Sequence, residues 1–291
     1  MIVITTPTGQ IGQEVLNLIS SSSEDIRAIM RDPSRLPQRL IKRVEIIQGS
    51  HDDIDVLTHS LKGAESLLWL VPPNPRSDNP MSHYLDFTRP ACEAIKQQGI
   101  KHVVGISSLG HAFGKNAGLL SPAFAMDELI MSTGVSYRSL LMPFFMENLL
   151  HQVQAIKNQG TFFMANSSDR ILATCATHDI ASMAARLLLD QSWTGQDSIP
   201  VVGPDDLSPE DMAQIMSHVL ERPIRYHQVP RTEYVETMMQ YGMSEAWATG
   251  LIDMVAAQDQ GIYDTESRIA QRTSTSFMEW CEKVLKPAIL M

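Results

Sequence analysis

Residues 2–12 read IVITTPTGQIG, a short apolar run followed by a turn that carries two glycines. Beyond the turn, Ile11, Val15 and Ile19 recur at helical spacing. A strand, a glycine-containing turn and a helix together form an anion site, because the first N–H groups of a helix have no internal partners and point outward. The stretch therefore predicts a phosphate-binding loop after the first strand of an α/β fold. A plain strand–helix turn would show the same pattern.

Two of the three glycines of a GxxGxxG loop are present in this turn, and Thr6 stands where the first would be. We expect Gly9 to let the backbone approach a pyrophosphate and Gly12 to let the helix pack closely on the strand. Because Pro7 restricts the residue before it, we expect an extended backbone and no positive φ at Thr6. The expected phosphate contacts are the N–H groups of Gln10 and Ile11 and the hydroxyl of Thr6 or Thr8.

Strands and helices alternate through the first half of the chain. The expected strands cover 2–4, 26–30, 44–47, 67–71, 102–106 and 137–142, and the helices between them cover 9–19, 54–61, 84–98 and 123–132. Strands that read as continuous apolar runs between helices indicate a parallel sheet covered on both faces. Right-handed crossovers then make a doubly wound, Rossmann-type α/β fold the expected architecture.

Helices dominate after about residue 143. They are expected at 144–158, 178–190, 208–221, 231–241, 244–258 and 275–285, with one short strand at 199–202. We therefore expect a Rossmann-type domain over residues 1–147 and a smaller, mainly helical substrate-binding region over residues 148–291. The strand near 199–202 is expected to return to the sheet.

Composition and charge narrow the range of partners. Hydrophobic residues make up 44% and charged residues 19% of the 291, and the formal net charge is −10. An acidic surface repels phosphate backbones, so we expect no nucleic-acid partner. We also expect no membrane association, because no run approaches the roughly 18 apolar residues of a membrane helix. A start without a secretion signal and three cysteines without CxxC spacing predict a cytoplasmic protein with reduced thiols.

The residues after the second strand indicate which dinucleotide the loop would hold. NAD sites place an acidic side chain near this strand end to bind the ribose hydroxyls. Here Arg31 follows the strand, with Arg35 close behind, and a guanidinium suits the 2′-phosphate of NADP. We therefore expect NADP(H) in preference to NAD(H). Asp32 is close enough to bind the ribose of NAD instead. Two solvated loop arginines that bind no ligand would give the same sequence pattern.

A series of short motifs resembles the NmrA-like group of atypical short-chain dehydrogenases/reductases over nearly the whole chain. They are TPTGQIG (6–12), RDPSRL (31–36), Gly49, GIKHVV (99–104), Ser107-Ser108, FMEN (145–148), HDIA (178–181) and VGP (202–204). The resemblance implies a Rossmann-type domain with a small C-terminal substrate region and NADP(H) in the cleft. It leaves two roles open, because the group contains both NADPH-dependent reductases and cofactor-sensing regulators.

The cofactor is expected along the carboxyl edge of the sheet. Beyond the loop and the two arginines, the expected contacts are Gly49, Ser50, His51, Leu70, Val71, Pro72, Ser107, Ser108 and Pro143. The expected substrate contacts are Tyr84, Phe144, Phe145, Asn148 and Trp247. Nearby methionines, among them Met126, Met142, Met146 and Met239, suit either ordinary core packing or a broad apolar pocket.

The usual proton relay of the larger relatives is missing. They use a Tyr-x-x-x-Lys pair, and none of the six tyrosines here has a lysine four residues on. By resemblance, Ala123 stands where many members have lysine or histidine, and Leu141 where arginine is common. The remaining candidates for catalysis are Ser107, His111 and Lys115, each of which also reads as an ordinary strand-end or loop residue.

Two functions follow from these observations. The first is an NADPH-dependent reductase that transfers hydride to an apolar small molecule, aromatic or conjugated. The reduced form of a conjugated acceptor can take its proton from water. The second is a non-catalytic NADP(H)-sensing regulator that acts on a protein partner. No HExxH motif or spaced Cys/His set occurs, so we expect no metal.

Overall fold

Seven parallel strands form the central sheet of the computed structural model, which describes residues 1–291. They are β1 (Ile2–Ile4), β2 (Ile26–Met30), β3 (Glu45–Gln48), β4 (Ser66–Trp69), β5 (His102–Ser108), β6 (Ser136–Met142) and β10 (Gln196–Pro200). Their order is β10-β6-β5-β4-β1-β2-β3, so the winding reverses beside β1. The expected doubly wound, Rossmann-type fold is confirmed. Ligands of such sheets bind outside the carboxyl ends of the strands, at the point of reversal.

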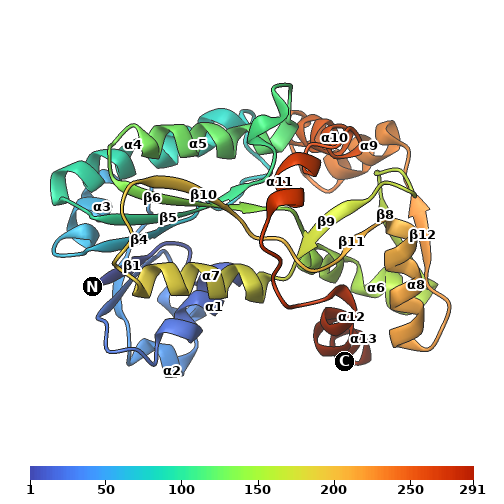
Figure 1. Cartoon of the computed structure of the whole chain (residues 1–291), viewed down its shortest axis with the longest axis horizontal. Helices are drawn as coiled ribbons and strands as arrows, with labels where there is room; N and C mark the ends of the chain where they lie inside the picture. Colours follow the sequence, from blue (N-terminus) through green and yellow to red (C-terminus); the bar gives the residue numbers. More distant parts are fainter.

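Helices cover both faces of the sheet (Figure 1). One face packs against α1 (Gln10–Ile19), α2 (Gln38–Ile41) and α7 (Thr177–Leu189), and the other against α3 (Ile54–Leu61), α4 (Pro80–Gln98) and α5 (Ser121–Met131). Because side chains of a strand alternate between faces, Ile2 and Ile4 lie in the first core and Val3 in the second. Burial on both faces explains why β1 and β4 read as unbroken apolar runs.

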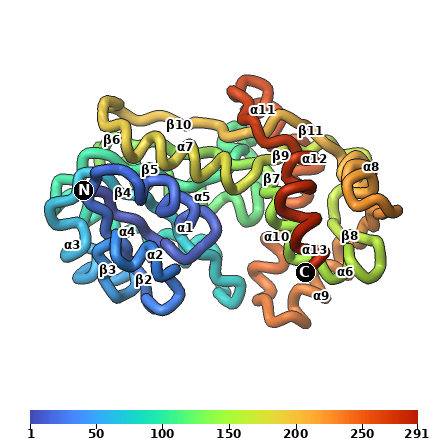
Figure 2. The backbone as a smooth tube through the Cα atoms, turned by 90° about the horizontal axis from the view of Figure 1, so that it is seen from below, coloured from blue at the N-terminus to red at the C-terminus, as the bar shows by residue number.

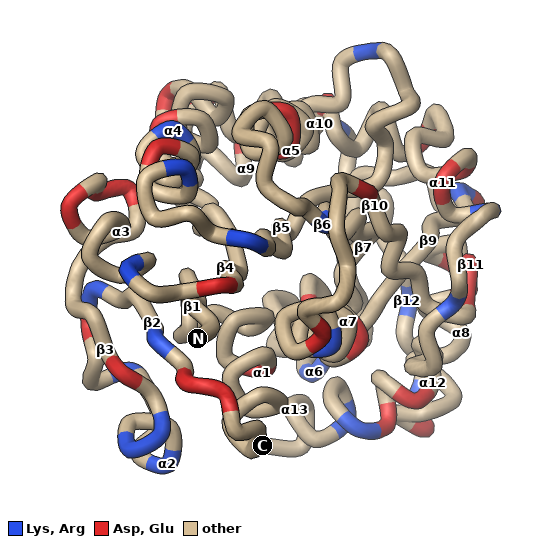
Figure 3. The backbone as a smooth tube through the Cα atoms, turned by 60° about the vertical axis from the view of Figure 1, so that its left-hand side comes forward, with Lys and Arg blue, Asp and Glu red and all other residues tan.

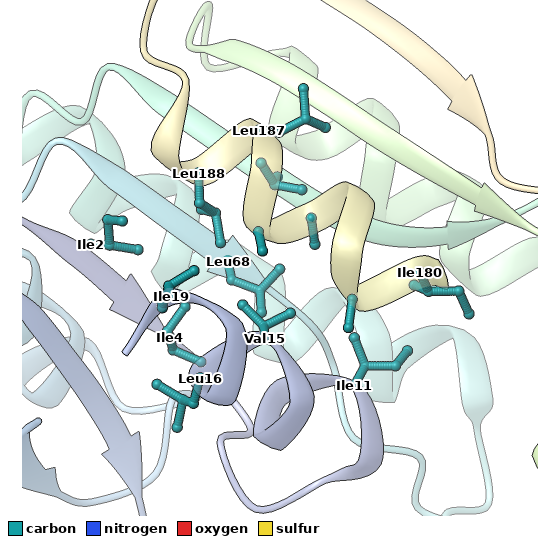
Figure 4. Packing of buried hydrophobic residues seen from close by; sticks show 14 of the residues in the cluster. Ile2, Ile4, Ile11, Val15, Leu16, Ile19, Leu68, Ile180, Leu187 and Leu188 are labelled. Carbon is teal, nitrogen blue, oxygen red and sulfur yellow. The ribbon is translucent and has the colours of Figure 1, made fainter. Parts of the chain in front are cut away.

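The contact between α1 and α7 joins distant parts of the chain (Figure 4). Val15 and Ile19 of α1 are fully buried, as are Ala181 and Ala184 of α7, and the two alanines let the helix axes approach closely. Leu188 fills the space between α7 and the strands. After α7 the chain enters β10, which pairs in parallel with β6 as the edge strand. Residues 177–200 therefore add a covering helix and the edge strand to the sheet.

The C-terminal region contains more strand than its sequence indicated (Figure 2). β7 (Phe144–Phe145), β9 (Leu172–Cys175) and β11 (Asp206–Leu207) form a three-stranded sheet, and β8 (Thr161–Met164) pairs with β12 (Arg225–Gln228). The expected helix over 144–158 is wrong at its start, because residues 146–152 form a 3-10 helix before α6 (Val153–Gln159). Strands this short give too few alternations for a sequence pattern to reveal them.

Helices make up most of the remaining C-terminal chain. They are α8 (Pro209–Leu220), α9 (Arg231–Gln240), α10 (Glu245–Asp259), α11 (Asp264–Ile269), α12 (Phe277–Trp280) and α13 (Lys286–Leu290). A π-helical turn over 281–285 connects α12 to α13. No helix combines the length and the apolar character that crossing a membrane would require.

A buried carboxylate joins the C-terminal region to α7. Glu147, which is 9% exposed, accepts a hydrogen bond from the Thr177 backbone N–H at 2.9 Å and another from Trp280 Nε1 at 3.0 Å. Thr177 is the first residue of α7, and no side chain of the helix's own N-cap satisfies its first N–H groups. Glu147 therefore caps α7 and holds α12 beside it.

Removing the Glu147 carboxylate should destabilise the protein. Glu147→Ala leaves two buried donors without acceptors, so we expect the free energy of unfolding to fall by about 2–4 kcal/mol. Chemical denaturation followed by circular dichroism measures the change. Glu282→Ala, which removes an exposed glutamate of the same region, is the control. Equal stability of the two variants would contradict this assignment.

Candidate functional site

The loop after β1 is held in a strained conformation at Thr6. Its φ is +52°, so the expected extended backbone at this residue is wrong. Two contacts stabilise the left-handed geometry: the Thr6 hydroxyl donates to the Leu70 carbonyl at 3.0 Å, and the Thr6 carbonyl accepts from the Gly9 N–H at 3.1 Å. The preference set by Pro7 is thus overridden by tertiary hydrogen bonds. Since the hydroxyl donor is used within the protein, Thr6 shapes the loop in this structure.

Gly12 has no space for a side chain. A Cβ atom there would lie 2.2 Å from the Thr6 carbonyl oxygen, a distance that no real contact shows. At Gly12 the helix therefore packs closely on the loop after β1 and not, as expected, on the strand itself. Gly9 differs, because its φ is −81° and an added Cβ would lie 3.3 Å from Thr6 Cγ2. The small size of Gly9 therefore leaves room for a ligand to approach the loop from the solvent.

The N-terminal end of α1 has no internal anion. No side chain caps it, and its first turn contains no acidic residue. The N–H groups of Gln10, Ile11 and Gly12 start the helix and lack the carbonyl partners found deeper in it. Together they form a cradle of donors, to which the helix dipole adds a partial positive charge. The cradle suits a phosphate.

The loop after β4 is tied to the loop after β1. The Leu70 carbonyl accepts from Thr6 and lies 3.1 Å from His51 Nε2, and the Leu70 N–H donates to the Thr5 hydroxyl at 3.0 Å. Burial lowers the pKa of His51 to about 4, so this imidazole is neutral near pH 7 and its Nε2–H donates to the carbonyl. His51 lies beside the Trp69 and Phe87 rings. The structure thus brings together three of the expected cofactor segments.

The chain after β2 is basic and exposed. Arg31 and Arg35 form no ion pair and no side-chain hydrogen bond, whereas Asp32 caps the following turn by accepting from the Ser34 N–H at 3.0 Å and the Ser34 hydroxyl at 2.7 Å. The hydrogen bonds from Ser34 lower the pKa of Asp32. Figure 3 shows basic residues gathered around α2, next to this turn. Both bonds from Ser34 end on Oδ1 of Asp32. The two guanidinium groups are available to an anion.

The other expected cofactor residues lie at the same edge of the sheet. Gly49 packs against Val56 of α3, where an added Cβ would lie 2.7 Å from Val56 Cγ2. Ser50 and Pro72 are half-buried, whereas Val71, Ser108 and Pro143 are buried. The Ser108 hydroxyl donates to neighbouring carbonyls, Leu109 at 3.1 Å and Met142 at 3.3 Å.

A buried carboxylate that the sequence did not single out organises the end of β5. Asp127 of α5 is 1% exposed and accepts from Ser107 Oγ at 2.5 Å, Ser139 Oγ at 2.8 Å and Tyr137 OH at 2.5 Å. Burial, and then Asp127, raises the pKa of Tyr137 well above its usual range. Gly105 makes room for the phenol, because a Cβ there would lie 1.9 Å from the Tyr137 hydroxyl oxygen.

His111 completes this cluster, and Lys115 does not join it. His111 Nε2 lies 3.0 Å from Asp127 Oδ2, and its ring packs on Phe124 at a centroid distance of 4.2 Å. Lys115 holds its ammonium 5.6 Å from the centre of the Phe113 ring and forms no ion pair. A pattern in the sequence marks Asp127: it falls on the buried stripe of α5 formed by 123, 126, 127 and 130.

The expected substrate residues pack in different parts of the structure. Phe144 packs against the C-terminal core and Phe145 against the core between the sheet, α1 and α7, while Asn148 is exposed. Tyr84 lies in the second turn of α4, and Trp247 is buried with its ring centre 6.5 Å from that of His83. A polar cavity of about 620 Å³ lies nearby, lined by Asp78, Asn79, Asn116, Glu245, Thr249 and Asp253 among others.

Three of the four methionines named above as pocket candidates are core residues. Met126, Met142 and Met146 are buried in three separate cores, while Met239 is 43% exposed. They therefore do not gather around one apolar pocket. No group of three or more His, Cys, Asp and Glu side chains is placed to hold a metal ion.

The chain belongs to the NmrA-like family, whose model matches residues 1–282. An NAD(P)H azoreductase of Xenophilus azovorans is 24% identical over 286 residues, which cover 97% of both chains. An NADPH-dependent quinone oxidoreductase of Escherichia coli, solved with NADPH, has a TM-score of 0.79 at 23% identity, covering 96% of this chain and 98% of its own. NmrA, a negative transcriptional regulator solved with NADP, has a TM-score of 0.74 at 15% identity, covering 98% and 95%. These two structures share the fold of this chain.

The two loop glycines should respond differently to the same substitution. Gly12→Ala places a methyl group on the Thr6 carbonyl and forces the loop to move, so we expect a loss of about 1–3 kcal/mol in the free energy of unfolding. Gly9→Ala, at a negative φ, meets a tight contact with the Thr6 methyl group that a small shift relieves, so it should stay within about 1 kcal/mol of wild type. Urea denaturation of the pair tests the packing. Similar losses in both variants would rule it out.

Proposed function

We propose that this NmrA-like chain is an NADPH-dependent reductase that transfers hydride to an apolar, conjugated small molecule. The observation that carries the proposal is the donor cradle at α1, where Gly12 packs on the Thr6 carbonyl and no side chain caps the helix. When bound, NADPH supplies the hydride. The protein's contribution is then to hold the nicotinamide and the acceptor against each other.

Three groups of residues would hold the cofactor. The N–H groups of Gln10 to Gly12 face the pyrophosphate, and Arg31 with Arg35 faces the 2′-phosphate. The neutral His51, packed among aromatic rings, borders the adenine side. The nicotinamide half would extend over the ends of β4, β5 and β6, next to Leu70, Ser107, Ser108 and Pro143. Basic residues at the β2 end, and an Asp32 engaged by Ser34, support NADP(H) over NAD(H).

The missing Tyr-Lys pair indicates which class of acceptor the site would reduce. No Tyr-x-x-x-Lys pair occurs in the chain, and Ala123 stands, by resemblance, where many family members have lysine or histidine. Reduction of a simple ketone leaves an alkoxide that needs a strong local donor. A conjugated acceptor spreads the developing charge and therefore needs a weaker proton donor. The named activities of the azoreductase and the quinone oxidoreductase, both on conjugated groups, support this class.

A second candidate is an NADP(H)-sensing regulator without turnover. The likeness to the NADP complex of NmrA, a negative transcriptional regulator, favours it. The same cradle would then bind the cofactor, and a protein partner would read its redox state. The two candidates differ in whether bound NADPH is consumed.

Replacing Arg31 should weaken NADPH more than NADH. Loss of a charge-assisted contact to the 2′-phosphate predicts an about tenfold higher Kd for NADPH in Arg31→Ala and little change for NADH. Fluorescence titration of both dinucleotides measures this difference. Lys42→Ala, which removes another exposed charge of the same segment, should bind both like wild type. If wild type and Arg31→Ala show no difference between the two cofactors, the assignment to Arg31 fails.

Turnover should be detectable with conjugated acceptors. We expect NADPH oxidation, followed at 340 nm, in the presence of at least one quinone, enone or cationic triarylmethane dye. Simple aliphatic ketones should react far more slowly, because no conjugation spreads the charge of the alkoxide that they would form. Tight NADPH binding without oxidation by any acceptor would instead support the regulator.

A further inference from the structure

Asp127 is an unusual residue to find inside a helix–sheet interface. It is 1% exposed, and no Lys or Arg side chain pairs with it. A buried carboxylate is costly unless hydrogen bonds and a counter-charge compensate it. Ser107, Ser139 and Tyr137 supply three of the hydrogen bonds through their hydroxyl groups. Only His111 can supply a positive charge, and it does so when its imidazole is protonated.

The imidazole of His111 lies between the buried carboxylate of Asp127 and the solvent. Its Nε2 faces Asp127 at 3.0 Å, while 29% of the side chain is exposed. Because a carboxylate only accepts hydrogen bonds, Nε2 carries the hydrogen, and Nδ1 is left to exchange a proton. Phe124 supports the ring from one side. The imidazole is therefore oriented with a free Nδ1.

The backbone at His111 is also held in place. Glu266 of α11 accepts from the Gly110 N–H at 2.5 Å and from the Ala112 N–H at 3.3 Å, which are the residues on either side of His111. Gly110 has a φ of +112° and follows the end of β5. Asp127 of α5 thus holds the side chain of His111, and Glu266 of α11 holds its backbone.

His111 stands where the reacting half of a bound dinucleotide would lie. β5 is the second strand from β1 in the sheet, with β4 between them. At about 4.8 Å per strand, the end of β5 is roughly 10 Å from the phosphate cradle, a distance that the nicotinamide ribose spans. The loop after β5 therefore borders the place of hydride transfer in a doubly wound fold.

We infer that His111 is the proton donor for acceptors that become anionic on reduction, with Asp127 as its positioning residue. The inference rests on the reductase function proposed above. The acceptor takes a hydride and its two electrons from the C4–H bond of NADPH, which becomes NADP⁺. The Nδ1–H bond of the imidazolium then breaks, and its proton goes to the anionic oxygen of the reduced acceptor. The neutral imidazole regains a proton from water.

Acceptors fall into two kinds under this scheme. An enone or a quinone gains negative charge with the hydride and needs a proton. A cationic triarylmethane dye is neutralised by the hydride itself and needs none. Activity toward the first kind should depend on His111, and activity toward the second should not.

His111→Gln is the central variant, because its amide nitrogen stands in for Nε2 and keeps the hydrogen bond to Asp127 but carries no titratable proton. We expect kcat with an enone or quinone to fall about 100-fold, with the cationic dye within twofold of wild type and NADPH affinity unchanged. Asp127→Asn should show the same selective loss. Glu128→Gln, the exposed neighbour on α5, should match wild type with both acceptors. A merely structural role predicts that His111→Gln behaves like wild type.

A second measurement does not depend on turnover. Long-range ¹H–¹⁵N spectra of the imidazoles, with His111 assigned by its absence in His111→Gln, should show the neutral ring protonated at Nε2. Equal losses with both acceptor kinds, or a ring protonated at Nδ1, would overturn the role of His111. Absence of turnover with every acceptor, despite tight NADPH binding, would reject the reductase function and the proton-donor role with it. The Nε2 tautomer would then report a structural pair only.

Discussion

The contact between the Thr6 carbonyl and the glycine at position 12 sets the geometry of the ligand edge. It requires a left-handed backbone at a threonine, which costs on the order of 1–3 kcal/mol unless the surroundings compensate. The compensation comes from the loop after β4: the Leu70 N–H donates to the Thr5 hydroxyl, and the Leu70 carbonyl accepts from the Thr6 hydroxyl. The loop that would receive phosphates is therefore shaped by two strands at once. The N–H groups at the start of α1 stay free for a ligand, because the hydrogen bonds to Leu70 stabilise the strained residue from within the protein.

Buried carboxylates connect the parts of this acidic protein. Glu147 bonds to the start of α7 and to Trp280, and Asp127 bonds to two strands and a loop. Asp179 accepts from the hydroxyl of Thr275 at 2.8 Å and from its N–H at 3.2 Å, which holds the C-terminal segment to α7. None of these three pairs with Lys or Arg. Each is satisfied by several donors at once, so removing one carboxylate disturbs more than one element.

The cluster around Asp127 bears directly on the choice between an enzyme and a regulator. A regulator needs the cradle and a surface that changes with the cofactor, and it has no use for a proton donor next to the nicotinamide. A reductase needs a means to neutralise its product. The imidazole that Asp127 orients in the loop after β5 would meet that need without a Tyr-Lys pair.

The sequence alone determined the sheet, because the continuous apolar strands and the helical stripes between them follow from burial on both faces. It also located the glycine-containing loop after β1 and the basic turn at Arg31, since glycine spacing and strand ends are local features. Tertiary contacts decided what local rules could not. They placed Thr6 at positive φ against the preference set by Pro7, and they formed strands of two to four residues after residue 143. They also brought Asp127, Tyr137 and His111 together, because α5, β6 and the loop after β5 meet only once the chain is wound over the sheet.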